Sequence, residues 1–253
     1  VRAALRLSGP PPLRAELVAA ADSRFSESRR ALGIPARMHD FGKSMLVCRI
    51  SHEVPHEDTA WEWFGHAQTL ALLPLGRDAD GRPRSSVVLT LPPQAMRAVQ
   101  ALDDEAFARD LERRFDGRLG SIDARGERHV YPLVGTYASR FIGPRFALVG
   151  DAAVGMHPVT AHGFNFGLLS VERLSACIAR AVRAGTPIHD PALLSAYDRG
   201  HRRDTLPLYM ATRGIVGLFT DDRWPARTLR SLALRGADAL PGFTRLLASR
   251  LSD

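Results

Sequence analysis

An acidic residue at the end of a buried strand is the feature of this sequence with the clearest chemical potential. Residues 145–149 (RFALV) form a short apolar run, and Gly150 and Asp151 follow it directly. Such a run is typical of a parallel strand buried on both faces, and open α/β sheets bind ligands at the carboxyl ends of these strands. A carboxylate there can accept hydrogen bonds from the hydroxyl groups of a sugar-like ligand. We therefore expect Asp151 to face a bound ligand.

The residues after Asp151 predict a tight loop and a helix that can approach a flat, anionic ligand. Pro158, Gly163 and Gly167 keep side chains out of the way, so that the backbone can come close to the ligand. From Phe166 or Gly167 onward, apolar residues recur at a helical spacing of three and four: Leu168, Leu169, Val171, Leu174, Cys177 and Ile178. The free N–H groups at such a helix start favour negative charge, as on a pyrophosphate or a reduced flavin ring.

The stretch 145–181 resembles the second nucleotide-binding motif of flavin-dependent aromatic hydroxylases with the para-hydroxybenzoate hydroxylase fold, and it looks most like the ubiquinone-biosynthesis hydroxylases. The residues that match the family pattern are Gly150, Asp151, Ala152, Ala153, His157, Pro158, Gly163, Asn165 and Gly167. The departures are Val154 for the usual His, Ala161 and His162 for Gly-Gln, and Ser170 where an Asp is common. One branch of quinone hydroxylases shows similar departures.

This resemblance implies FAD as the cofactor, bound by Gly150, Asp151, Ala152, Pro158, Gly163, Phe164 and Asn165. A second segment agrees with it: Asp22, Ser26 and Arg29 keep the spacing of the family's Asp-Gly motif, which contacts FAD and NAD(P)H in related enzymes. Ser23 replaces the usual Gly. Asp-Ser at a helix start is also ordinary N-capping chemistry, so the segment gains weight only together with Asp151. Asp22 and Arg29 are its expected cofactor-binding residues.

The family also begins with a strand–turn–helix that carries G-x-G-x-x-G and receives the ADP half of FAD. No such motif occurs here, and the run Gly9–Pro12 cannot replace it because consecutive prolines do not form a strand–turn–helix. We expect the chain to lack an N-terminal FAD-binding unit. The alternative is a naturally shortened protein that has lost its flavin site.

The expected fold class is mixed α/β: the C-terminal part of a Rossmann-like FAD/NAD(P)-binding domain, an antiparallel-sheet substrate domain and C-terminal helices. The expected boundaries are 1–40 for the remainder of the FAD-binding domain, 41–135 for the substrate-binding sheet, 136–185 for the Gly-Asp part of the FAD-binding domain, and 186–253 for a helical region. Apolar runs and turn residues predict strands at 44–50, 61–75 (two strands), 85–91 and 129–134, and helices over 95–119 and 193–210.

Several side chains admit more than one role. Tyr131, Pro132 and His157 are the expected substrate-side residues by resemblance, with plain packing or loop ordering as the alternatives. For Trp61 and Trp63, which alternate on a strand, we expect packing in the core rather than contact with a quinone ring. His52 and His56 have the spacing of a helical metal pair. Pro55 lies between them, so a solvated loop without metal is expected instead. Asp103 to Glu105 are expected to cap a helix.

Composition limits the partners. The net charge is +7, but Lys43 is the only lysine, so the arginine bias indicates a GC-rich genome and we expect no nucleic-acid partner. Two cysteines without a C-x-x-C pair favour the cytoplasm. No apolar run reaches the ~20 residues of a membrane span. Beyond Pro225, leucines alternate with arginines. This stretch is either a basic amphipathic segment that contacts the inner membrane face peripherally or a helix packed on the protein.

As a whole, the resemblance implies a flavin-dependent monooxygenase that hydroxylates an aromatic ring of a quinone or phenol precursor, in ubiquinone biosynthesis, through a flavin C4a-hydroperoxide. Its partners would be a lipophilic quinone or phenol, O₂, NAD(P)H or another electron donor, and other proteins of the quinone pathway. The alternatives are a flavin-dependent reductase or halogenase of the same fold, or a non-enzymatic fragment. The cofactor supplies the reactive chemistry in such enzymes, so no catalytic residue is assigned.

Overall fold

A computed structural model describes residues 3–5, 13–65, 68–157 and 162–220 of the chain. The chain divides into two compact units: unit 1 comprises residues 1–37 and 136–253, and unit 2 comprises residues 38–135. The chain passes from one unit to the other within two strands of the sheet, β4 (Ala36–His52) and β9 (His129–Ala138). The predicted mixed α/β class is confirmed.

Unit 2 is built on an antiparallel sheet. Besides β4 and β9 it contains β5 (Trp61–Gly65), β6 (Gln68–Arg77), β7 (Pro83–Leu91) and the short β8 (Ile122–Asp123). The strand order is β9-β4-β7-β6-β5, and β8 pairs with the end of β4. Residues opposite one another, such as Leu46, Leu89 and Leu70, share the buried face, because side chains alternate between the two faces of a strand.

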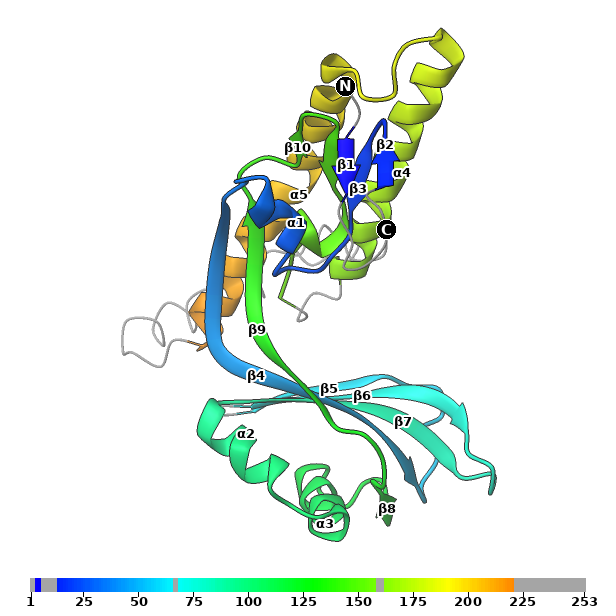
Figure 1. Cartoon of the computed structure of the whole chain (residues 1–253). Coiled ribbons are helices and arrows are strands. Elements are labelled where there is room, and N and C mark those ends of the chain that lie inside the picture. The colour runs from blue at the N-terminus through cyan, green and yellow to red at the C-terminus, as the bar shows by residue number, and fades with distance from the viewer. Residues whose placement is uncertain (1–2, 6–12, 66–67, 158–161, 221–253) are drawn as a thin grey trace, which may run out of the picture. The chain divides into compact units, whose positions relative to one another are not determined.

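Two helices, α2 (Pro93–Gln100) and α3 (Asp104–Arg114), cover one face of this sheet (Figure 1). Helix α3 starts as predicted, because the Asp103 carboxylate accepts the N–H of Ala106 at 2.7 Å. The core between the helices and the sheet includes Phe107, Leu111 and Leu119, all at 0% exposure. Trp61 and Trp63 pack against this core, with their ring centroids 5.3 Å apart. Their predicted role in core packing is thereby confirmed.

The loop between His52 and His56 is exposed as predicted, but the two histidines themselves are not solvated. His52 is the last residue of β4 and has 0% exposure, and His56 is also buried. The ring nitrogens of His52 are 2.8 Å from the Val54 carbonyl oxygen and 2.9 Å from the Ser85 hydroxyl oxygen. The polar sequence around Pro55 concealed this burial, because the buried partner Ser85 comes from another strand.

Unit 1 holds a small sheet in the order β10-β11-β3, with β10 (Ile142–Gly143), β11 (Phe146–Leu148) and β3 (Val18–Ala20). Strands β3 and β11 are parallel, as expected for the run before Asp151. The shorter elements of unit 1 are β1 (Ala3–Leu5), β2 (Leu13–Ala15), α1 (Glu27–Ala31), the 3₁₀ turn η1 (Gly150–Ala152) and β12 (Val154–Gly155).

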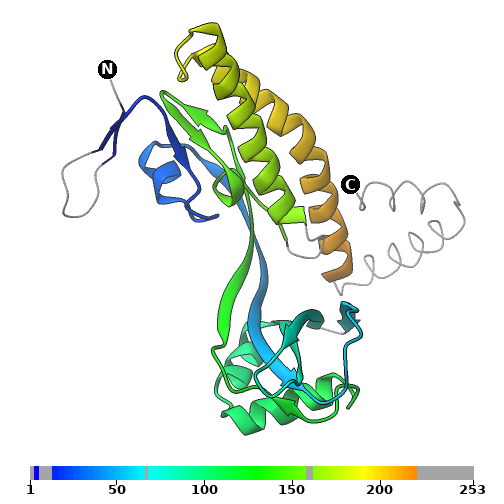
Figure 2. The same cartoon turned by 90° about the vertical axis from the view of Figure 1, so that its right-hand side faces the viewer.

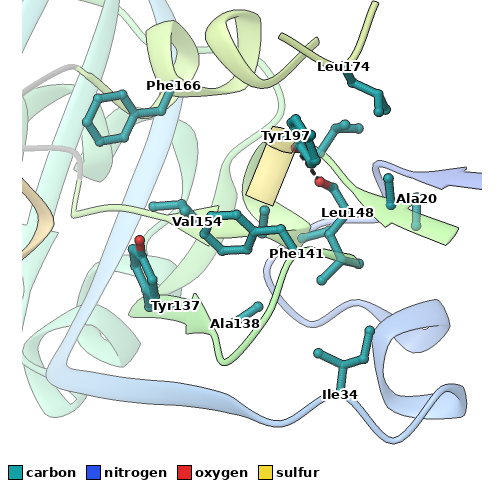
Figure 3. Close-up of a cluster of buried hydrophobic side chains, with 14 of the residues drawn as sticks. Ala20, Ile34, Tyr137, Ala138, Phe141, Leu148, Val154, Phe166, Leu174 and Tyr197 are labelled. Carbon is teal, nitrogen blue, oxygen red and sulfur yellow. Dashed lines mark hydrogen bonds between the residues drawn. The ribbon is translucent and has the colours of Figure 1, made fainter. Parts of the chain in front are cut away.

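Helices α4 (His162–Ala184) and α5 (Pro191–Thr220) complete unit 1 and pack side by side (Figures 1 and 2). Helix α4 begins at His162, one turn before the predicted start. The core between helices and strands includes Phe141, Leu148 and Tyr197 (Figure 3), and the Tyr197 hydroxyl donates to the Leu148 carbonyl at 2.6 Å. In the described part of the chain, no helix is both apolar and long enough to traverse a bilayer.

Candidate cofactor site

A groove of about 590 Å³ lies in unit 1 where β3 and β11 end and α4 begins. Its polar side is formed by Arg24 and Asp151, and Gly150, Gly163 and Gly167 line it with backbone. This position at the carboxyl edge of two parallel strands is where open α/β sheets bind ligands. The groove therefore lies where the sequence predicts that Asp151 faces a bound ligand.

The turn at Gly150 brings backbone to the groove surface. Gly150 has a φ of +60°, which favours glycine, and a Cβ added there would meet no atom within 4 Å. Its N–H donates to the Ser170 hydroxyl at 2.9 Å, and that hydroxyl donates to the Gly167 carbonyl at 2.6 Å. Ser170, at the position where related sequences often have Asp, thus ties the strand end to helix α4.

Asp151 forms an ion pair with Arg24. The guanidinium Nη2 of Arg24 donates to Oδ2 of Asp151 at 2.8 Å, and the two side chains are 25% and 34% exposed. A carboxylate has about four lone-pair sites on two oxygens, so one hydrogen bond from Arg24 leaves Asp151 able to accept others. The pair places a charge-balanced acceptor at the wall of the groove.

Arg29 joins the two predicted motifs. Its side chain is only 2% exposed, and it donates to the Ala152 carbonyl at 2.9 Å and to the Arg24 carbonyl at 3.0 Å. Ala152 itself is fully buried. The guanidinium therefore fastens the segment around Arg24 to the segment that carries Asp151, as expected if both belong to one site.

Asp22 organises the start of α1. Its carboxylate accepts from the Ser26 hydroxyl at 2.5 Å and from the Ser28 N–H at 2.9 Å. Burial by itself raises the pKa of Asp22, but these hydrogen bonds outweigh that effect and lower the pKa below its ordinary value. Ser26 is the N-cap of α1 and accepts the N–H of Arg29 at 3.0 Å. The capping chemistry considered as an alternative for this segment is present.

One wall of the groove is apolar. Phe164, Leu168 and Val171 lie at helical spacing on α4 and are 74%, 55% and 50% exposed. Met156 adds a buried side chain to the lining. An apolar wall beside a carboxylate and exposed backbone suits a ligand that combines a flat ring with hydroxyl groups.

The other predicted residues are distributed over both units. Asn165 is exposed in the first turn of α4, and His157 is half-buried just after β12. Pro158 lies outside the described residues. Tyr131 and Pro132 are exposed on β9 in unit 2, where the Tyr131 ring stacks with that of His129 at 6.4 Å. Their assignment to substrate stays a prediction.

Sequence reasoning missed Arg24, Ala21, Met156, Leu168 and Val171 in the lining of the groove. For Leu168 and Val171 a signal existed, because both belong to the apolar periodicity that we assigned to the helix. Arg24 had only a weak one, its place between Asp22 and Ser26. Its contact with Asp151 depends on folding, since 127 residues separate the two.

The comparisons with known proteins place this chain in one family. A family model described as "FAD binding domain" matches residues 2–205. Ubiquinone hydroxylase UbiM of Neisseria meningitidis is 42% identical over 240 residues, which cover 95% of this chain and 51% of UbiM. Ubiquinone hydroxylase UbiL of Rhodospirillum rubrum is 37% identical, covering 95% of this chain and 55% of UbiL. The chain thus spans about half the length of these relatives.

A solved structure shows the same fold. The p-nitrophenol 4-monooxygenase PnpA from Pseudomonas putida superposes with a TM-score of 0.69 at 17% sequence identity. The superposition covers 96% of this chain and 60% of PnpA.

Proposed function

Because the chain belongs to the FAD binding domain family, we propose that it supplies part of the FAD site and the antiparallel sheet of a flavin-dependent monooxygenase that hydroxylates the aromatic ring of a quinone precursor. The observation that carries this proposal is the groove of unit 1, in which Asp151 lies at the end of β11 beside exposed glycine backbone. The two relatives named above support the reaction class, since both are called ubiquinone hydroxylases.

The residues of the groove fit a flavin nucleotide. Neither Gly150 nor Gly163 would bring a Cβ within 4 Å of another atom, so backbone there stays open to a close ligand. Asp151 offers carboxylate oxygens to the ribityl hydroxyls, and the first N–H groups of α4 suit the electron-rich edge of the ring or a phosphate. Phe164 and Leu168 provide apolar surface. Arg29 holds the Arg24 segment against the segment that carries Asp151, and Asp22 orders the start of α1.

Bound FAD would supply the activation of O₂ that a hydroxylase needs, with NAD(P)H or another donor as the source of electrons. The protein's part is to bind, orient and exclude water. In unit 1, Asp151 and the backbone of the turn at Gly150 would bind the flavin nucleotide. The Ser170 hydroxyl, which is hydrogen-bonded to both Gly150 and Gly167, would orient them by holding the end of β11 against α4. Tyr131 and Pro132 of unit 2 and His157 of unit 1 remain our candidates for contact with a lipophilic quinone or phenol.

The alternatives receive less support. Halogenases share the fold, as CmlS does at a TM-score of 0.63 and 19% identity, but likeness at that level shows the fold alone. The relatives at 42% and 37% identity are hydroxylases by name. A peripheral contact with the inner membrane face, suggested for the stretch after Pro225, concerns residues outside the described part of the chain and stays a prediction from sequence.

The test uses the full-length product of the gene. FAD titration should show stoichiometric binding, and reaction under ¹⁸O₂ with a quinone precursor that has an unsubstituted ring carbon should place one labelled oxygen on the ring. Asp151→Ala should raise the Kd for FAD about tenfold or more, because a hydrogen bond to a charged group contributes about 1.5–3 kcal/mol. Glu27→Ala is the matched control, since this carboxylate on α1 is 93% exposed.

Two results would contradict the proposal. The first is a folded wild-type protein without affinity for FAD. The second is FAD-dependent turnover of the quinone precursor without ¹⁸O in the product, which indicates a reductase.

A further inference from the structure

Arg24 is the one cation in the described lining of the groove, and nothing in the proposed function assigns it a task. We propose that Arg24 is a positioning residue that prepares Asp151 for a dianionic flavin nucleotide: it fixes the orientation of the carboxylate and cancels its charge. This inference rests on the proposed function, because it takes the groove to be the FAD site.

The backbone around Arg24 aims its side chain at Asp151. The preceding Ser23 has a φ of +76°, a left-handed conformation that a non-glycine residue adopts at an energetic cost. The turn is closed by the Ser26 N–H, which donates to the Ser23 carbonyl at 3.0 Å. Arg29 then holds the Arg24 carbonyl at 3.0 Å. The direction of Arg24 is therefore set by the fold and not by the ion pair alone.

A glycine leaves the room that Arg24 needs. A Cβ added to Gly155 would come within 3.1 Å of the Arg24 Cβ, tighter than an ordinary contact. Gly155 belongs to β12, which pairs with β9 at Thr136, so it cannot easily move away. The packing of Arg24 against Gly155 is therefore part of the fold of unit 1. In this respect the Arg24–Asp151 pair differs from an ion pair between exposed surface side chains, which contributes little to stability.

Charge explains why such a pair would be useful. A diphosphate-bearing cofactor carries about two negative charges, and an unpaired carboxylate in a partly buried groove repels it. With Arg24 hydrogen-bonded to Oδ2 of Asp151, the pair has a net charge close to zero and no longer repels an approaching anion. The carboxylate can still accept hydrogen bonds from neutral hydroxyl groups. Arg24 then acts on the ligand through Asp151, and its removal should matter only while Asp151 is present.

A double-mutant cycle on the full-length gene product tests this dependence. The Kd for FAD of the apoprotein is measured for wild type, Arg24→Met, Asp151→Ala and the double variant. Arg24→Met alone should raise the Kd roughly tenfold, and it should add nothing in the Asp151→Ala background, since contacting residues are coupled. Arg24→Lys keeps the charge and should lose less affinity than Arg24→Met.

Two further measurements separate positioning from a merely structural role. The defect of Arg24→Met should shrink when salt is raised, because salt screens the repulsion between Asp151 and the diphosphate; damage to the fold would persist. Arg30→Met is the matched control, since Arg30 is 66% exposed and pairs only loosely with Glu27 at 3.8 Å. It should leave the Kd unchanged. Melting temperatures of the four apoproteins report on folding.

The inference is overturned if Arg24→Met leaves the Kd within twofold of wild type. It is also overturned if the variant multiplies the Kd by the same factor with and without Asp151, which would make Arg24 an independent ligand contact. A wild-type protein that does not bind FAD overturns the proposed function as well, so the two failures are distinguishable.

Discussion

Unit 1 and unit 2 both bury ionisable side chains, but they give them different partners. In unit 2, His52 has both ring nitrogens in hydrogen bonds, to Val54 and Ser85. In unit 1, His201 of α5 is equally buried, but neither of its ring nitrogens has a hydrogen-bond partner among the described residues. Its ring stacks on Tyr197 at 5.9 Å and meets the edge of Phe141 at 5.3 Å.

The difference shows that burial alone does not define the role of a histidine. The hydrogen bond between His52 and Ser85 links β4 to β7, whereas His201 packs as an aromatic ring that must stay uncharged. Burial lowers the pKa of both, and for His201 it lowers the pKa to about 4, with the nearby Arg173 acting in the same direction and Asp198 opposing it. Unit 1, which holds the groove, should therefore be the more acid-sensitive of the two.

The largest effect is expected at Arg29, another buried ionisable group of unit 1. Arg29→Met leaves the buried carbonyl of Ala152 and that of Arg24 without their donor, which should lower the free energy of unfolding by about 3 kcal/mol. Urea denaturation of the chain measures this. Arg30→Met, one residue along the same helix but exposed, should change it by less than about 0.5 kcal/mol. Equal effects of the two variants would refute the positioning role of Arg29.

The next effect tests the comparison of the histidines directly. The pKa of His201 is about 4 in the folded chain and near 6.5 in the unfolded chain, so the unfolded chain takes up the proton first as pH falls. Stability that is present above pH 6.5 is then lost between pH 6.5 and 4, by about 2.5 kcal/mol at pH 4.5. His201→Phe should remove this loss when unfolding in urea is compared at pH 7 and pH 4.5.

The exposed His129, which is 54% accessible, offers the control. His129→Phe should leave the acid-induced loss as it is in the wild type. If His201→Phe loses as much stability at pH 4.5 as the wild type does, the ring of His201 is not the origin of the acid sensitivity, and the contrast between the units fails.

The smallest effect is expected in unit 2. Ser85→Ala removes the hydroxyl partner of His52 while the ring stays buried, which should cost about 1.5 kcal/mol of unfolding free energy at pH 7. Ser86→Ala, on the opposite face of β7 and only half-buried, should cost less than about 0.5 kcal/mol. If Ser85→Ala leaves the free energy of unfolding unchanged, His52 tolerates a ring nitrogen without a hydrogen bond, as His201 does.

Part of unit 2 was predictable because β5, β6 and β7 pair with their neighbours in sequence. The turn residues at 80–83 and the alternation of buried and half-buried side chains in β7 indicate a hairpin by local rules. Asp103 likewise predicts the start of α3. The burial of His52 escaped prediction, since the residue that decides it, Ser85, acts across the sheet. Local polarity around Pro55 pointed the other way.

In unit 1, the sequence located Asp151 because an apolar run before an acid is a local signal. The partners of Asp151 were not predictable in the same way. Arg24 and Arg29 meet the Gly-Asp segment only through contacts spanning 123 to 127 residues, and no spacing rule covers such distances. The residue types at a strand end can be read locally, whereas the network that positions them is a property of the folded unit.

The discontinuity of unit 1 also has a consequence during protein synthesis. Strand β3 leaves the ribosome before all of unit 2, and its parallel partner β11 is made only afterwards. At about 5–20 residues per second, the interval is on the order of ten seconds. Throughout it, the backbone of β3 has no β11 to pair with, while the hairpins of unit 2 can already close. Nascent chains should thus be exposed to chaperones and to misassociation through the segment around β3, and the groove can form only after unit 2 has been made.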